Sequence, residues 1–288
     1  MTSKHRIVVS TQNNAYSGWQ CKLFYLSCVT RVEHQPIFMV HANGSAWHPD
    51  FYALARAGAM VLPAPCYVAN AQPPRNTAGS LLHAADACGE DELIVLCDPD
   101  MIFRRKPVFP EKLSGNQYTY MSYAQLAVQQ ASETLGLSWE LVERSGSQLC
   151  CGVPYVIPVR QARPLAKAWM QAVDAFPQRD WEEMWLDIMY AFGLATLKLG
   201  LEVALTDMVD DNSSPDAVLL REMIHYCYGG DIWNKRWFYY DEQAPEVWQL
   251  SGCAERNTVL GEIFSQIEEA GEFYRDAYFA SHSLKRCS

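Results

Sequence analysis

One continuously apolar segment, residues 93–97 with the sequence LIVLC, constrains the fold of this chain most strongly. A strand with one face in water alternates apolar and polar side chains, whereas a strand without polar positions is buried on both faces. Strands of the second kind are typical of parallel sheets that helices cover on both sides. The segment therefore predicts an α/β fold with a mostly parallel central sheet flanked by helices.

Short apolar strands alternate with helical patterns through the first part of the chain. Strand-like runs occupy residues 6–10, 36–41 and 59–65, and apolar positions with helical spacing occupy residues 19–32, 51–58 and 73–89. This alternation is the pattern of βαβ units, in which helices join parallel strands. No internal repeat or low-complexity linker interrupts the sequence, so we expect one domain over residues 1–288.

The second half of the sequence is less regular. We expect strands at residues 118–125, 151–159 and 203–212, and helices at residues 160–176, 181–199 and 254–280. The strand at 151–159 contains Pro154 and Pro158. Because proline cannot donate a ladder hydrogen bond, we expect this strand to be bent or to lie at a sheet edge.

Composition limits the classes of protein to which the chain can belong. It has 288 residues and a net charge of −10, whereas proteins that bind nucleic acids through phosphates usually carry a basic excess. The sequence contains no run of eighteen apolar residues, so it predicts no membrane-spanning helix. The N-terminus leads into a first strand rather than a signal peptide, and the ten cysteines form no CxxC pair. We therefore expect a cytoplasmic protein with reduced thiols and no membrane partner.

An acid-proline-acid triplet, Asp98-Pro99-Asp100, directly follows the apolar strand. On an extended segment alternate side chains point the same way, so both carboxylates lie on one face. Such a pair can hold a divalent cation, and oxygen ligands suit Mg²⁺ or Mn²⁺. Aspartate and proline also favour turns with solvated carboxylates. Ligands of parallel sheets bind beyond the carboxyl ends of the strands, so a metal site and a plain turn both stay open.

A second polar segment, HYCYGGDIWNK at residues 225–235, carries the residue types of a diphosphate site. His225 follows an apolar pair and offers a nitrogen ligand. Gly229 and Gly230 would let the backbone approach a ligand closely, and Lys235 would add a positive charge. A core histidine before a glycine turn is the alternative interpretation of the same residues.

The ordered motifs resemble a known class of enzyme. DPDMIF, followed by Pro107, is similar to the DxD region of GT-A fold nucleotide-sugar glycosyltransferases. DIMYAFGLA and IHYCYGGDIWNK resemble segments of the plant hydroxyproline O-arabinosyltransferases and peptidyl-serine galactosyltransferases, over roughly residues 6–240. The histidine-glycine-lysine order also resembles the clamp of retaining enzymes related to glycogenin. The plant enzymes carry a membrane anchor, for which this sequence offers no apolar segment, so the acceptor stays open.

The resemblance implies a role for each motif. Asp98, Asp100 and His225 would ligate Mn²⁺ or Mg²⁺ against the diphosphate of a UDP-sugar, with Asp98 also in reach of the ribose. The other implied donor-binding residues are Thr11, Gln12, Asn13 and Tyr16 for base and ribose, Arg75, Asn76 and Ser80 at a helix N-terminus, Gly152 for the sugar, and Gly229 and Lys235 for the diphosphate.

The stereochemistry decides whether a catalytic base is needed. A retaining enzyme of this type, which the resemblance implies, requires no strong general base, whereas an inverting one needs a carboxylate. Glu183 and Asp187 are the candidates, because residues four apart share a helix face, and a solvated helix face is the alternative interpretation. Trp181 and Trp185 on this helix would stack on a sugar or acceptor, or belong to the core.

The sequence therefore predicts a metal-dependent glycosyltransferase that moves arabinose or a hexose from a UDP-sugar to an acceptor hydroxyl. The acceptor is a peptide, a hydroxymethylated DNA base as in some phage glycosyltransferases, or a small molecule. A DNA acceptor predicts a basic groove beside the acidic triplet that includes Arg104, Arg105 and Lys106. A non-catalytic sugar-nucleotide-binding protein is the alternative from a different functional class.

Overall fold

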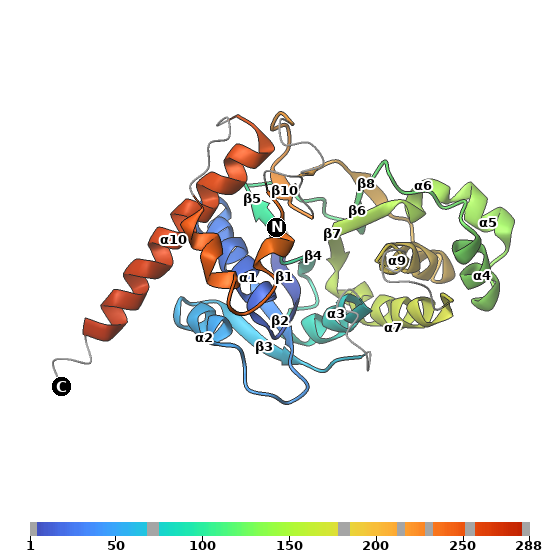
Figure 1. The fold of residues 1–288 in the computed structure, drawn as a ribbon. Helices are drawn as coiled ribbons and strands as arrows, with labels where there is room; N and C mark the ends of the chain where they lie inside the picture. Colours follow the sequence, from blue (N-terminus) through green and yellow to red (C-terminus); the bar gives the residue numbers. More distant parts are fainter. Residues whose placement is uncertain are drawn as a thin grey trace.

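The structure is a computed structural model that describes residues 5–67, 75–177, 185–211, 217–227, 233–250 and 257–283. Its centre is a seven-stranded sheet with the strand order β3-β2-β1-β4-β7-β6-β8. These strands are β1 (His5–Gln12), β2 (Ile37–His41), β3 (Met60–Ala64), β4 (Leu93–Cys97), β6 (Ser114–Gln117), β7 (Cys151–Pro158) and β8 (Ala204–Thr206). Figure 1 shows the sheet running through the molecule, with helices packed on both sides.

Strands β1 to β4 form the parallel part of the sheet. β1 lies between β2 and β4 and is parallel to both, and β3 continues the sheet in parallel beyond β2. Every residue of β4 is buried, in agreement with its uninterrupted apolar sequence. β6 and β8 are parallel as well, so the sheet is mostly parallel, as the sequence predicts.

β7 lies inside the sheet, antiparallel to both β4 and β6, so the edge position, one of the two alternatives expected for it, is wrong. All eight of its residues are buried. The pairing with β6 shifts register between Gly115 and Asn116, which leaves Pro154 in an irregular part of the ladder, and Pro158 ends the strand. A bulge and a strand end are the positions at which a sheet tolerates proline, so the interior location is physically consistent.

Two further expectations differ from the structure. Residues 118–125 form turns rather than a strand, and β6 occupies the preceding polar residues instead. The side chain of Asn116 compensates for burial there, because its Oδ1 accepts a hydrogen bond from Met208 N at 2.8 Å. The first helix begins at Ala15, within the expected loop, because Asn14 Oδ1 accepts from Ser17 N and caps it.

The helices cover the sheet in two groups. They are α1 (Ala15–Ser27), α2 (Pro49–Arg56), α3 (Asn76–Ala87), α4 (Leu126–Thr134), α5 (Trp139–Arg144), α6 (Gly146–Leu149), α7 (Val159–Ala175), α9 (Asp187–Lys198) and α10 (Val259–Ser283), with short segments η1 (Cys28–Val32), η3 (Lys235–Phe238) and η4 (Ala244–Gln249). α3 packs on α7 and α7 on α9, and α1 packs on α2 and α10 (Figure 1). Within the described part of the chain, no helix has the length and apolar character of a membrane span.

A second, three-stranded sheet lies next to the carboxyl end of β4. It consists of β5 (Met101–Phe103), β10 (Met223–His225) and β9 (Val209–Asp211), in that order across the sheet. β10 runs antiparallel to β5 and places His225 opposite Met101. An aromatic cluster supports the chain beyond β10: Trp19 of α1, Tyr226, Trp233 and Phe238 are buried and in mutual ring contact. This small sheet and its cluster bring a late segment of the chain to the end of β4.

Candidate functional site

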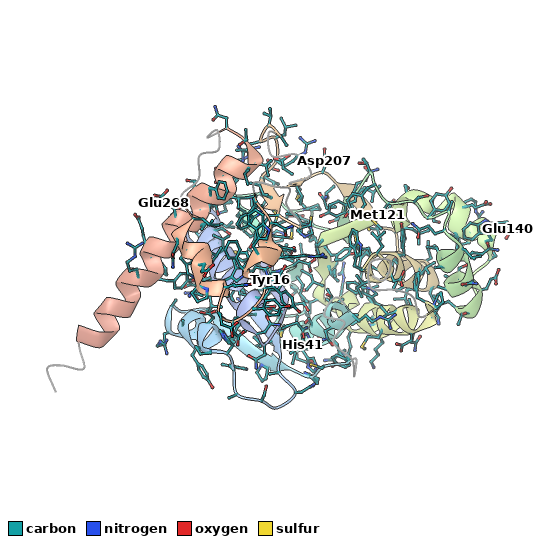
Figure 2. The ribbon with its side chains drawn as sticks, viewed as in Figure 1. Tyr16, His41, Met121, Glu140, Asp207 and Glu268 are labelled. Carbon is teal, nitrogen blue, oxygen red and sulfur yellow. The ribbon has the colours of Figure 1, made fainter. Side chains whose placement is uncertain are left out.

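A cavity of about 710 Å³ lies beyond the carboxyl ends of β1 and β4. This volume is within the range of small-molecule sites, roughly 300–1,000 Å³. One wall carries charged groups from the loop after β4, from the end of β10 and from the segment that follows it, and another wall carries aromatic and apolar side chains from β7, α7 and the start of α9. Figure 2 shows Tyr16, one of the lining residues, near the middle of the molecule.

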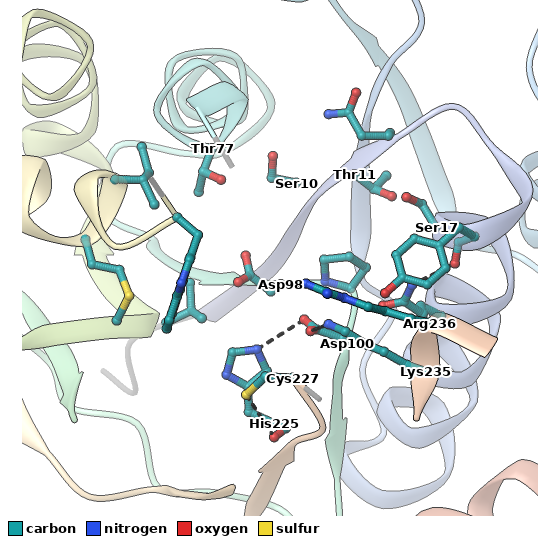
Figure 3. Close-up of a pocket in the computed structure, with 18 of the residues that line it drawn as sticks. Ser10, Thr11, Ser17, Thr77, Asp98, Asp100, His225, Cys227, Lys235 and Arg236 are labelled. Carbon is teal, nitrogen blue, oxygen red and sulfur yellow. Dashed lines mark hydrogen bonds and ion pairs between the residues drawn. The ribbon is translucent and has the colours of Figure 1, made fainter. Parts of the chain in front are cut away.

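The charged wall is built on the short pairing of β5 with β10. Asp98 and Asp100 follow β4, and the antiparallel pairing brings His225 beside them. His225 Nε2 lies 3.2 Å from Asp100 Oδ1, a contact that Figure 3 marks with a dashed line. The backbone supports the same arrangement, because Tyr226 N donates to the carbonyl oxygen of Asp100 at 3.0 Å. The position of His225 is therefore fixed by sheet pairing rather than by a free loop.

Lys235 completes this charged group from the first turn of η3. Its ammonium contacts Asp100 Oδ2, so Asp100 has a positive or polar partner on each carboxylate oxygen. Asn234 fixes the start of η3, because its Oδ1 accepts from Arg236 N at 2.9 Å. Arg236 also lines the cavity, which places two cationic side chains from one short helix at the same wall.

The charged groups shift one another's pKa values. Burial, together with the carboxylate of Asp100, raises the pKa of Asp98 to about 6. Burial would also raise the pKa of Asp100, but the charges of Lys235 and His225 outweigh it and hold that pKa well below its usual range. For Lys235, burial disfavours the ammonium, yet Asp100 dominates and raises its pKa. Of the two carboxylates, Asp98 is therefore the one whose negative charge is less well balanced by nearby positive charge.

Asp98, Asp100 and His225 form a group that could hold a metal ion. One ligand atom from each lies within 4.8 Å of the others. Two carboxylates and one imidazole suit Mg²⁺ or Mn²⁺. Burial first, and the neighbouring carboxylate of Asp100 second, raise the pKa of Asp98, and a divalent cation would favour its charged form. The residues present therefore fit such an ion.

The loop after β1 contributes most, but not all, of the residues expected there. Thr11, Gln12 and Tyr16 line the cavity. Asn13 is not among the lining residues: its amide donates to the carbonyl oxygen of Ala46 at 2.8 Å, and its Oδ1 accepts from His48 N at 2.7 Å. The Asn13 side chain therefore holds the loop between β2 and α2 in place.

Helix α3 contributes a different residue from those expected. Arg75, Asn76 and Ser80 lie on its first turns, but none of them lines the cavity, whereas Thr77 does. Asn76 Oδ1 accepts from Tyr67 N at 2.8 Å, which ties the helix start to the preceding segment. Ser80 is fully buried and lies behind the cavity wall.

Gly152 of β7 lies directly behind the aromatic wall. A Cβ atom at this position would lie 2.2 Å from Met189 Cε and 2.8 Å from the ring of Tyr118, and both of these side chains line the cavity. The absence of a side chain at Gly152 therefore lets the wall pack against the strand.

The helix that carries the catalytic candidates is only partly described. Asp187 is almost completely buried at the start of α9 and is not among the lining residues. Trp185 lines the cavity and pairs with Tyr120, with ring centroids 6.0 Å apart. Glu183, Trp181 and Gly229 lie outside the described residues.

Several lining residues were missed by the sequence analysis. They are Ser10, Asn14, Ser17, Gln20, Thr77, Tyr118, Tyr120, Cys227, Arg236, Tyr239 and Tyr240, among others. For Ser10 a signal was present, because it directly follows the apolar residues Ile7, Val8 and Val9 and lies toward the carboxyl end of the strand. The tyrosines gave no such signal, because their segments have no regular secondary structure that would fix the direction of their side chains.

Two residues of the basic run after β5 bond to the segment that precedes β10. Arg104 Nε donates to the carbonyl oxygen of Arg221, and Arg105 pairs with Glu222 at 2.7 Å. None of Arg104, Arg105 and Lys106 lines the cavity. This run therefore adds no basic side chain to the lining of the cavity.

Comparison with known proteins gives a match in structure alone. No protein-family model matches the sequence, and no curated protein is significantly similar to it. Among solved structures, the galactosyltransferase LgtC, crystallised with donor and acceptor sugar analogues, matches with a TM-score of 0.52 and 13% identity. The match covers 93% of this chain and 95% of that one. The chain therefore has the GT-A type of α/β fold that the sequence predicts.

Proposed function

We propose that this protein is a metal-dependent glycosyltransferase that moves a sugar from a UDP-sugar to an acceptor hydroxyl. The observation that carries the proposal is the convergence of Asp98, Asp100, His225 and Lys235 on one wall of a 710 Å³ cavity. The likeness in fold to a galactosyltransferase supports the reaction class. Mn²⁺ or Mg²⁺ would be held by the two aspartates and the histidine.

The donor diphosphate would lie against the charged wall. A bound divalent cation would neutralise the charge that develops on the departing UDP. Lys235 and Arg236 would face the same diphosphate and offer charge-assisted hydrogen bonds to its oxygens. Because these groups are held by η3 and by the sheet of β5 and β10, their charges are positioned before the reaction begins.

Retention of the anomeric configuration is the outcome that the described residues favour. Among them, the carboxylates that line the cavity are Asp98 and Asp100, and both belong to the candidate metal site. An inverting reaction needs a further carboxylate at the acceptor hydroxyl. Asp187 is buried beside the wall rather than on it, which argues against this residue as the base.

The acceptor would lie against the aromatic wall of the cavity. Trp185 and Tyr120 form a ring pair there, and Tyr120 is 48% exposed. Aromatic faces of this kind pack against the apolar faces of sugar rings and other planar groups. A saccharide or other small molecule is therefore the acceptor class we propose. The position of Arg104 and Arg105 gives no support to a DNA acceptor.

Hydrolysis of UDP-sugars with Mn²⁺ tests the proposal. Across a panel of UDP-hexoses and UDP-pentoses, we expect turnover of at least one donor, and a loss of about 100-fold or more in Asp100→Asn. Asp91→Asn is the matched control, because Asp91 is exposed and precedes the same strand β4 that Asp98 follows. If Asp100→Asn and Asp91→Asn turn over the donor equally, Asp100 is not part of the catalytic site. Binding of UDP without turnover of any donor would favour the non-catalytic binding protein.

A further inference from the structure

A chain of three hydrogen-bonded side chains runs from the interior to the cavity wall. His41 Nδ1 lies 2.7 Å from the carbonyl oxygen of Pro65, and His41 Nε2 lies 2.8 Å from Ser80 Oγ. Ser80 Oγ in turn lies 2.9 Å from Ser10 Oγ. His41 and Ser80 are buried, whereas Ser10 lines the cavity, where Figure 3 shows it between Thr77 and Thr11.

Regular secondary structure holds each member of this chain. His41 ends β2, Ser10 lies near the end of the neighbouring parallel strand β1, and Ser80 lies in α3 above them. Groups on strands and helices keep their geometry better than groups on loops. The three side chains are therefore positioned before any ligand enters the cavity.

The direction of every hydrogen bond follows from the carbonyl at the inner end. A carbonyl oxygen only accepts, so His41 Nδ1 carries a proton and donates it to Pro65. Burial, the largest influence, lowers the pKa of His41, so the ring is neutral and Nε2 accepts. Ser80 must then donate its single proton to His41, and its oxygen accepts from the hydroxyl of Ser10.

This order leaves Ser10 with one role toward the cavity. Its only proton is committed to Ser80, so it presents lone pairs to a ligand and no donor. We propose that Ser10, oriented by Ser80 and His41, selects a hydroxyl or N–H group of the nucleotide-sugar at this point of the cavity. The inference rests on the proposed function for the identity of the ligand. A ligand group that can only accept would face the lone pairs of the Ser10 oxygen and could form no hydrogen bond with it.

Three parts of a UDP-sugar carry the chemistry that Ser10 would select. They are the uracil N3–H, the ribose hydroxyls and the hydroxyls of the sugar. Each is tested by replacing a donor with a group that only accepts: CDP in place of UDP, 2′-fluoro and 3′-fluoro analogues of UDP, and monofluorinated forms of UDP-galactose. Fluorine accepts weakly and cannot donate, so each fluorinated pair differs chiefly in the proton that Ser10 would receive. CDP replaces the uracil N3–H with an acceptor nitrogen and also exchanges the carbonyl at C4 for an amino group, so for this pair the comparison with Ser10→Ala decides.

The experiment is isothermal titration calorimetry of the full chain, which measures the affinity for each member of these ligand pairs in the presence of Mn²⁺. We expect the unaltered protein to prefer the donor-bearing member of one pair by about two- to tenfold, the value of a single hydrogen bond. Ser10→Ala should abolish that preference, because no acceptor remains on the wall. Ser80→Ala should reduce it as well, because Ser10 regains a proton that it can donate to the fluorinated ligand.

Two further variants separate this role from a structural one. Ser80→Thr keeps a hydroxyl and should keep the preference, whereas Ser132→Ala removes another fully buried serine hydroxyl, from α4, and should leave it unchanged. If Ser80→Ala fails to fold, Ser10→Ala still tests whether Ser10 causes the preference, because this variant leaves Ser80 paired with His41. The inference is overturned if UDP binds and no pair shows a preference, or if the preference survives in Ser10→Ala. Failure of every uridine ligand to bind overturns the proposed function as well.

Discussion

His225 Nε2 lies 3.2 Å from Asp100 Oδ1, although the two residues are 125 positions apart in the sequence. The contact exists because β10 pairs with β5, which directly follows the acidic triplet. Lys235 reaches the other oxygen of the same carboxylate from η3. The candidate site therefore depends on a short sheet that joins the end of β4 to a late segment of the chain.

Replacement of Lys235 by methionine should change metal binding and nucleotide binding in opposite directions. In the free protein the ammonium competes with a cation for Asp100, so Mn²⁺ affinity should rise by about tenfold or more, since opposite charges near a protein surface interact by about 4 kcal/mol. UDP affinity with saturating Mn²⁺ should fall by about tenfold or more, because one charge-assisted hydrogen bond is lost. Titration calorimetry measures both constants.

Lys167→Met is the control for this pair of measurements, because Lys167 is exposed on α7 and does not line the cavity. It should alter neither constant. A decrease of both affinities in Lys235→Met would show that Lys235 supports the site only by structure.

Gly152→Ala should destabilise the protein and disturb the cavity together. The added methyl group would overlap Met189 and the buried ring of Tyr118, and overpacking of this kind costs about 1–3 kcal/mol. Urea unfolding measures the loss of stability, and UDP-sugar hydrolysis should also fall. Gly89→Ala is the control, because the atoms nearest to a Cβ there belong to Glu92, at an ordinary contact distance of 3.7 Å. An unchanged free energy of unfolding in Gly152→Ala would contradict this prediction, because it would mean that Met189 and Tyr118 move aside without loss of stability.

Trp185→Ala should separate acceptor binding from donor binding. Trp185 belongs to the aromatic wall and pairs with Tyr120, whereas the charged groups come from the loop after β4, from β10 and from η3. Transfer to the best methyl glycoside of a panel should fall by about tenfold or more, because one aromatic stacking partner is removed. Hydrolysis of the donor by water should change by less than about twofold. Equal losses in transfer and hydrolysis would place Trp185 in donor binding instead.

The sequence was most informative where one pattern had one physical interpretation. The segment LIVLC could only be buried on both faces, and β4 is buried throughout. The acidic triplet had two interpretations, because a turn and a metal site use the same residues. The structure has a turn at Pro99 and Asp100, and the contact of Asp100 with His225 adds a third candidate ligand that favours the metal site. That contact depends on a strand of three residues that local sequence hardly marks.

Side chains that act from behind the wall were the hardest to predict. Ser80 was expected to meet the ligand from a helix N-terminus, yet it is fully buried and bonded to His41 and Ser10. The interior position of β7 was also beyond local reasoning, because Pro154 is tolerated only through a shift in the register of a partner strand. Both features arise from packing between segments that are distant in sequence.

Calorimetric titration of UDP with and without Mn²⁺ tests the central claim most directly. We predict binding in the presence of Mn²⁺, and affinity weaker by about tenfold or more both in EDTA and in Asp100→Asn, because the diphosphate then loses the charge that holds it. Asp91→Asn should bind as the unaltered protein does. Equal UDP affinity with and without the metal, or in Asp100→Asn, would contradict a metal-dependent nucleotide-sugar site at the end of β4.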